Sequence, residues 1–125
     1  AGVAVTSDER WKENVTTLTG SLDLIKQLNP VSFTWNQISG RGGDEDIGFI
    51  AQQVEPIIPE VVYTQDDVAE YEDDGVTLKE GTPVTIDNPK HMENGKLTAN
   101  LTKAIQEQQV MIDNLIARVN ALENA

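Results

Sequence analysis

The chain has 125 residues, which is enough for one domain with a modest hydrophobic core. Its 21 acidic residues outnumber 9 basic ones, and the net charge of -12 argues against nucleic acid or an anionic membrane as a partner. It has no cysteine, which excludes disulfides and thiolate metal sites, and no apolar run long enough to span a membrane.

The first six residues, 1–6, are weakly apolar and uncharged, and we interpret them as the end of a larger upstream segment. Thr6 and Glu9 then have capping-box spacing, which predicts a helix start. Positions five apart, such as Ser7 and Lys12, lie about 140° apart around a helix and on opposite faces of a strand. A contact between these two side chains therefore requires Ser7 to lie just outside the helix.

The following segments predict a small α+β domain. Apolar residues recur at helical spacing over 18–28 and the pattern ends at Pro30, which indicates a helix. Residues 31–35 alternate apolar and polar side chains, as a half-buried strand does. We also expect strands over 47–51, 61–63 and 84–86, a short helix over 52–57, and a polar excursion containing a hairpin over 64–82.

The acidity is concentrated in residues 44–80, which contain twelve acidic residues and one basic residue, Lys79. A solvated surface is the ordinary interpretation of such a run. The alternative is that like charges hold protruding parts of neighbouring subunits apart until their intended partner arrives. The sequence leaves both open.

No metal ion and no cofactor is expected. Glu70, Glu72 and Asp74 imitate the start of a calcium loop, but the twelfth position is Gly81 instead of a bidentate glutamate. His91 is the single histidine, and we interpret it as an exposed loop residue.

The tail has a heptad pattern, which predicts a coiled-coil helix. The seam positions are spaced alternately by four and three residues: Leu101, Ile105, Gln108, Ile112, Leu115, Val119 and Leu122. Isoleucine or valine at a with leucine at d leans towards dimers in parallel coils. Gln108 adds a polar layer that can change the register or the oligomeric state.

Four blocks in this order resemble the intramolecular chaperone domain of phage tailspikes and tail fibres. They are SDERWK at 7–12, GFIAQQVE at 48–55, PEVV at 59–62, and AIQEQQ at 104–109 followed by the heptad tail. The family includes the endosialidase C-terminal chaperone, is of the peptidase S74 type, and has a cellular relative in the myelin regulatory factor. The resemblance spans residues 7–124.

The resemblance implies a homotrimer in which the chain partners itself and an upstream fibre or spike. It places cleavage at Thr6–Ser7 and divides the chain into an upstream end (1–6), a chaperone and auto-processing domain (7–96) and a coiled-coil helix (97–125). The expected location is the host cytoplasm during virion assembly, with release from the fibre after cleavage. The alternative is a non-cleaving structural trimerisation module or a fibre-tip attachment module.

By the same resemblance, Ser7 is the nucleophile and Lys12 the general base of a single-turnover Ser-Lys dyad. A lysine in water has a pKa of about 10.4, and burial lowers it. Cleavage is therefore expected to wait for folding and assembly, and attack within one chain or between subunits stays open. Asp8 and Arg10, which also match the motif, are interpreted as structural partners at a helix N-terminus.

Overall fold

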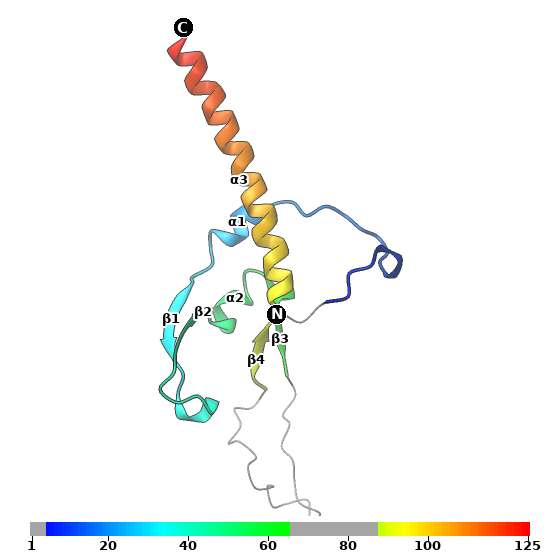
Figure 1. Ribbon diagram of the computed structural model, residues 1–125, viewed down its shortest axis with the longest axis vertical. Coiled ribbons are helices and arrows are strands. Elements are labelled where there is room, and N and C mark those ends of the chain that lie inside the picture. Colours follow the sequence, from blue (N-terminus) through cyan, green and yellow to red (C-terminus); the bar gives the residue numbers. More distant parts are fainter. Residues whose placement is uncertain (1–4, 66–87) are drawn as a thin grey trace, which may run out of the picture.

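The computed structural model describes residues 5–65 and 88–125. It shows a mixed α/β fold with short antiparallel strands and a long C-terminal helix, as the sequence predicts (Figure 1). The elements in chain order are the 3-10 helix η1 (Glu9–Trp11), α1 (Ser21–Ile25), β1 (Val31–Thr34), the 3-10 helix η2 (Gln37–Ser39), β2 (Glu45–Gly48), α2 (Ala51–Val54), the 3-10 helix η3 (Pro59–Val61), β3 (Val62–Thr64), β4 (Lys90–Met92) and α3 (Asn94–Glu123).

The strands form two separate antiparallel pairs. β1 pairs with β2, with Val31 opposite Gly48, and β3 pairs with β4, with Val62 opposite Met92. The first pair projects from the body as a hairpin, whereas the second leads directly into α3 (Figure 1). Among the described helices, none is long and apolar enough to cross a membrane.

The core lies where α1, α2, η3 and the first turns of α3 meet. Its fully buried apolar residues are Val54, Ile58, Val61 and Leu97. The half-buried side chains packed around them are Leu24, Ile25, Leu28, Phe49, Ile57, Val62 and Met92. The block at 48–55 contributes Val54 to this core and Phe49 to its surroundings. The second half of α3 extends beyond the body (Figure 1).

A polar contact fastens the start of α1 to the middle of α3. Gly20 precedes α1 in a left-handed conformation and offers no side-chain cap, so the Glu107 carboxylate takes that role. Glu107 accepts hydrogen bonds from the backbone N–H of Gly20 (3.1 Å) and of Leu22 (3.0 Å). Beside them, the buried Ser21 hydroxyl donates to the buried Asn100 side chain at 3.1 Å. We call these five residues the α1–α3 clasp.

The clasp predicts a pH-dependent contribution to stability. The hydrogen bond from the Leu22 backbone, followed by weaker contributions from Gly20, Ser21 and the charge of Lys103, holds the pKa of Glu107 below its ordinary value of 4.5. Stabilisation by a lowered carboxylate pKa is complete above the unfolded-state pKa and disappears as the pH falls through the folded one. The loss of unfolding free energy caused by Glu107→Gln should therefore be largest near neutrality and shrink below 4.5.

Urea denaturation of both proteins at one chain concentration, over a series of pH values, measures this difference. A Glu107→Gln deficit that stays the same from neutral to strongly acidic pH would contradict it.

Three predicted helices differ from the structure in their boundaries. The capping box from Thr6 does not form, because the short η1 turn is capped by Asp8 instead. The helix expected over 18–28 begins only at Ser21, because the left-handed turn at Gly20 breaks it from the preceding residues. The short helix over 52–57 is present as α2, which begins and ends earlier.

The strand predictions succeeded to different degrees. The strand over 31–35 is confirmed as β1 and that over 61–63 as β3, whereas the one over 47–51 lies earlier, as β2. β4 was not predicted, and His91 is a half-buried strand residue within it, not an exposed loop residue. The strand over 84–86, the calcium-like segment at 70–81 and nearly all of the excursion over 64–82 lie outside the described residues.

Candidate active site

The short segment before α1 contains a single 3-10 turn. The backbone N–H of Trp11 donates to the Asp8 carbonyl at 3.2 Å, and that of Lys12 donates to the Glu9 carbonyl at 3.0 Å. The turn ends after Trp11, where Lys12 returns to extended backbone with φ -117° and ψ 145°. Residues before and after the turn are thus extended and close together.

Asp8 and Arg10 hold this turn in place. One carboxylate oxygen of Asp8 accepts from the backbone N–H (2.9 Å) and from Nε (3.1 Å) of Arg10, and the other accepts from Nη2 at 2.8 Å. The Arg10 side chain, and then its backbone N–H, lower the pKa of Asp8, and the same side-chain bond raises the pKa of Arg10. Their predicted role as structural partners at a helix N-terminus is confirmed.

The structure brings Ser7 and Lys12 together. Ser7 lies before the turn, next to the extended Asp8, and Lys12 lies directly after it; Lys12 Nζ donates to Ser7 Oγ at 2.7 Å. The requirement that Ser7 lie outside the helix is met, because the two residues flank η1. The scissile bond expected from the sequence, Thr6–Ser7, adjoins this contact.

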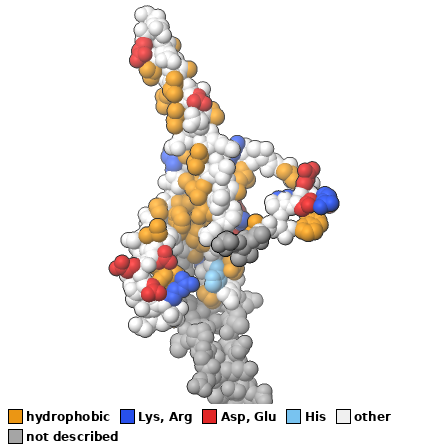
Figure 2. All heavy atoms as spheres, in the orientation of Figure 1, with side chains coloured by type: hydrophobic (Ala, Val, Ile, Leu, Met, Phe, Trp, Pro, Cys, Tyr) orange, Lys and Arg blue, Asp and Glu red, His pale blue; other side chains and the backbone are white. Residues whose placement is uncertain are grey.

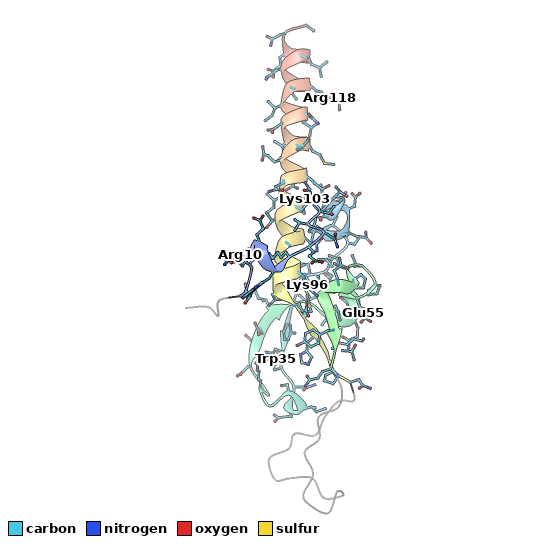
Figure 3. The ribbon with its side chains drawn as sticks, turned by 90° about the vertical axis from the view of Figure 1, so that its right-hand side faces the viewer. Arg10, Trp35, Glu55, Lys96, Lys103 and Arg118 are labelled. Atoms are coloured by element: carbon cyan, nitrogen blue, oxygen red, sulfur yellow. The ribbon has the colours of Figure 1, made fainter. Side chains whose placement is uncertain are left out.

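Both side chains are exposed in the single chain. Every residue from 5 to 19 is exposed, including Trp11, whose exposed fraction is 76%. We call this segment the arm; it loops away from the body before rejoining it at α1 (Figure 1), and Figure 3, in which this side of the molecule faces the viewer, labels Arg10 on it. Water therefore reaches the Ser7–Lys12 pair freely.

The predicted heptad seam lies on α3, and its residues are exposed. Ile105 is 65% exposed and Leu115 56% exposed. The body covers a different face of the helix, through Leu97, Asn100 and Ala104. Apolar side chains are visible along the helix in Figure 2, both against the body and beyond it.

No group of three His, Cys, Asp or Glu side chains within the described ranges could hold a metal ion. His91 instead contacts Gln65 Oε1 through Nε2 at 2.6 Å and stacks on Tyr63, with ring centroids 5.1 Å apart. These contacts give His91 a structural role in the β3–β4 pair.

The comparisons with known proteins point to one family. Residues 7–63 match the family described as the chaperone of endosialidase, peptidase family S74. This match, over just under half of the chain, and the two solved structures below support membership of this family. The matched region begins at Ser7 and includes Lys12 and the core residues Val54, Ile58 and Val61. The comparison with curated proteins gives no significant match.

Two solved structures share the fold of this chaperone. A crystal structure of an intramolecular chaperone is 17% identical, with a TM-score of 0.58, and covers 84% of this chain and 99% of its own. The carboxy-terminal domain of the bacteriophage T5 L-shaped tail fibre, with its intramolecular chaperone domain, is 15% identical, with a TM-score of 0.52. That match covers 94% of this chain and 32% of the T5 chain, so this chain spans about a third of it.

The sequence reasoning missed the role of the α1–α3 clasp. Glu107 belongs to the block at 104–109 that we used for the resemblance, but we assigned it no partner. A signal was present in the sequence, because α1 begins at Gly20 with no side chain that could cap it. Such a helix needs a cap from elsewhere.

Proposed function

We propose that this chaperone trimerises, assists folding of an upstream phage fibre or spike, and then releases itself by cutting its own chain at Thr6–Ser7. The observation that carries the proposal is the 2.7 Å contact between Lys12 Nζ and Ser7 Oγ, beside the bond to be cut. In this proposal the domain acts in the host cytoplasm during virion assembly, and after cleavage it leaves the mature fibre.

The contact provides the parts of a Ser-Lys dyad. A charged lysine donates to the serine oxygen, whereas a neutral one accepts the hydroxyl proton and acts as a general base. Ser7 Oγ then attacks the carbonyl carbon of Thr6, the C–N bond breaks, and Lys12 returns the proton to the departing amine of Ser7. Water hydrolyses the resulting ester, which leaves a carboxylate on Thr6 and restores the Ser7 hydroxyl.

The exposure of the arm explains why assembly would control this chemistry. In water a lysine is almost always charged, so a neutral amine needs drier surroundings. Among the described residues, the arm packs on nothing that would supply them, and a neighbouring subunit or the upstream fibre supplies them instead. The Ser7–Lys12 contact within one chain favours a dyad whose two residues come from one subunit. The Thr6–Ser7 bond that this dyad cuts belongs either to the same chain or to a neighbouring subunit.

The arrangement of α3 supports self-association. Its 30 residues extend about 45 Å, and the body covers only one face of the first half. The seam lies roughly 60° around the helix from that face, and its residues are exposed, so other copies can pack there without displacing the body. Exposed apolar stripes of this length mark interaction surfaces. We propose a trimer, as in the resemblance, although the pattern of isoleucine and leucine alone leans towards a dimer.

The chaperone role predicts opposite effects of removing the domain before and after assembly. Deletion of residues 7–125 from the full gene should give aggregated fibre, because long-range β-rich trimers fold slowly and expose strand edges meanwhile. Removal by cleavage after assembly should instead leave a fibre that unfolds more slowly than a Ser7→Ala fibre, which retains the domain. Native gels and unfolding half-lives in heat or detergent measure both effects.

If the deleted gene yields trimeric fibre as efficiently as the full-length gene, the chaperone role is wrong. The domain would then be the structural trimerisation or attachment module.

A further inference from the structure

The arm is joined to the body at one place. Among the hydrogen bonds and ion pairs of the described residues, those formed by residues 5–19 remain within the arm. The first bond to the body is made by the backbone N–H of Gly20 to Glu107, and the next by that of Leu22 to the other oxygen of the same carboxylate. The direction in which the arm leaves is therefore set at the α1–α3 clasp.

Two features fix that direction. Gly20 has φ +74° and no atom within 4 Å of the position of a Cβ, so it serves as a turn and not as a packing contact. Both oxygens of Glu107 are occupied by backbone N–H groups, which fixes the orientation of the carboxylate, and bonds to a charged acceptor are stronger than neutral ones. Ser21 and Asn100 anchor the same place with a buried hydrogen bond.

We propose that Glu107 is a positioning residue for the self-cleavage: it fixes the base of the arm to α3 and thereby sets where Ser7 and Lys12 lie relative to the assembled helices. Glu107 immediately precedes Gln108 of the seam, so the base of the arm moves together with the helix that associates. The inference rests on the self-cleavage proposed above.

The test compares two charge-removing variants of the full 125-residue chain. Glu107→Gln keeps the side-chain size but removes the charge and one of the two acceptor oxygens. The control, Glu55→Gln, removes a carboxylate that bonds Lys90 at 3.0 Å in the body, away from the arm. We expect Glu107→Gln to assemble normally but to cleave about 10- to 100-fold more slowly, the range that small misplacements of reacting groups produce. Glu55→Gln should cleave at the wild-type rate.

A second measurement reports the arm directly. In a Trp35→Phe background Trp11 is the single tryptophan, since the chain has two. With Ser7→Ala also present to keep the chain intact, the fluorescence anisotropy of Trp11 in the assembled protein should fall in Glu107→Gln and stay unchanged in Glu55→Gln. Loss of general stability would not produce this difference.

Wild-type cleavage by Glu107→Gln, equal slowing in both variants, or slow cleavage with unchanged anisotropy would each overturn the positioning role. If the wild-type chain itself does not cleave, the proposed self-cleavage fails. The anisotropy then decides on its own whether Glu107 orders the arm.

Discussion

The 125-residue chain should lose its first six residues when incubated without added protease or metal, and Ser7→Ala should abolish this loss. The substitution removes the nucleophile and leaves the 3-10 turn intact, because Asp8 and Arg10 hold that turn without the Ser7 side chain. Mass spectrometry of the intact protein over time measures the cut at Thr6–Ser7. A Ser7→Ala chain that is cut at the same bond at the wild-type rate would show that Ser7 is not the nucleophile.

Lys12→Arg separates the charge of Lys12 from its role as a base. Arginine keeps the positive charge and can donate to Ser7 Oγ, but its guanidinium does not give up a proton in proteins. This variant should fold and assemble normally and remain uncut. Glu13→Gln, an exposed change at the next position of the arm, is the matched control and should cleave normally. Rapid cleavage by Lys12→Arg would exclude Lys12 as the general base.

The part of the site that the sequence predicts is the part determined locally. Ser7 and Lys12 are five positions apart, and no regular helix or strand brings such positions together, so a contact between them required Ser7 to lie just outside the helix. The residue predicted to cap the turn between them, Thr6, is the wrong one. Thr6 and Glu9 have suitable spacing, but Asp8 competes successfully because its carboxylate reaches both the backbone and the side chain of Arg10.

The parts of the fold that the sequence does not predict depend on distant residues. Lys90–Met92 shows no apolar alternation, and it forms a strand because it pairs with Val62–Thr64. Similarly, Glu107 lies in α3, whose heptad pattern accounts for the neighbouring seam residues but gives Glu107 no role. The role of Glu107 is apparent only from the fold, in which α1 packs beside α3. This packing brings Glu107 to Leu22, which lies 85 residues earlier in the sequence. The glycine at the N-cap of α1 signals only that a side-chain cap is missing, and no local pattern identifies the distant residue that supplies it.

Charging the seam should abolish assembly and self-cleavage together. In Ile112→Asp/Leu115→Asp, two apolar contacts that a coiled coil would bury become unpaired charges, each costing of order several kcal/mol to bury. The fold of the body should survive, because both positions lie beyond Leu97, Asn100 and Ala104, which face it. Light scattering should show a single chain, and mass spectrometry an uncut one.

The matched control places the same two charges on the opposite side of the helix. Val110 and Ala117 lie roughly 160–180° from the seam, and Val110→Asp/Ala117→Asp should therefore assemble and cleave as the wild type does. Since the arm is exposed in the described part of the single chain, we expect packing between chains to exclude water from Ser7 and Lys12. A seam variant that is monomeric and still cuts at the wild-type rate would separate the chemistry from assembly, and the dyad would then need another source of dry surroundings within its own chain.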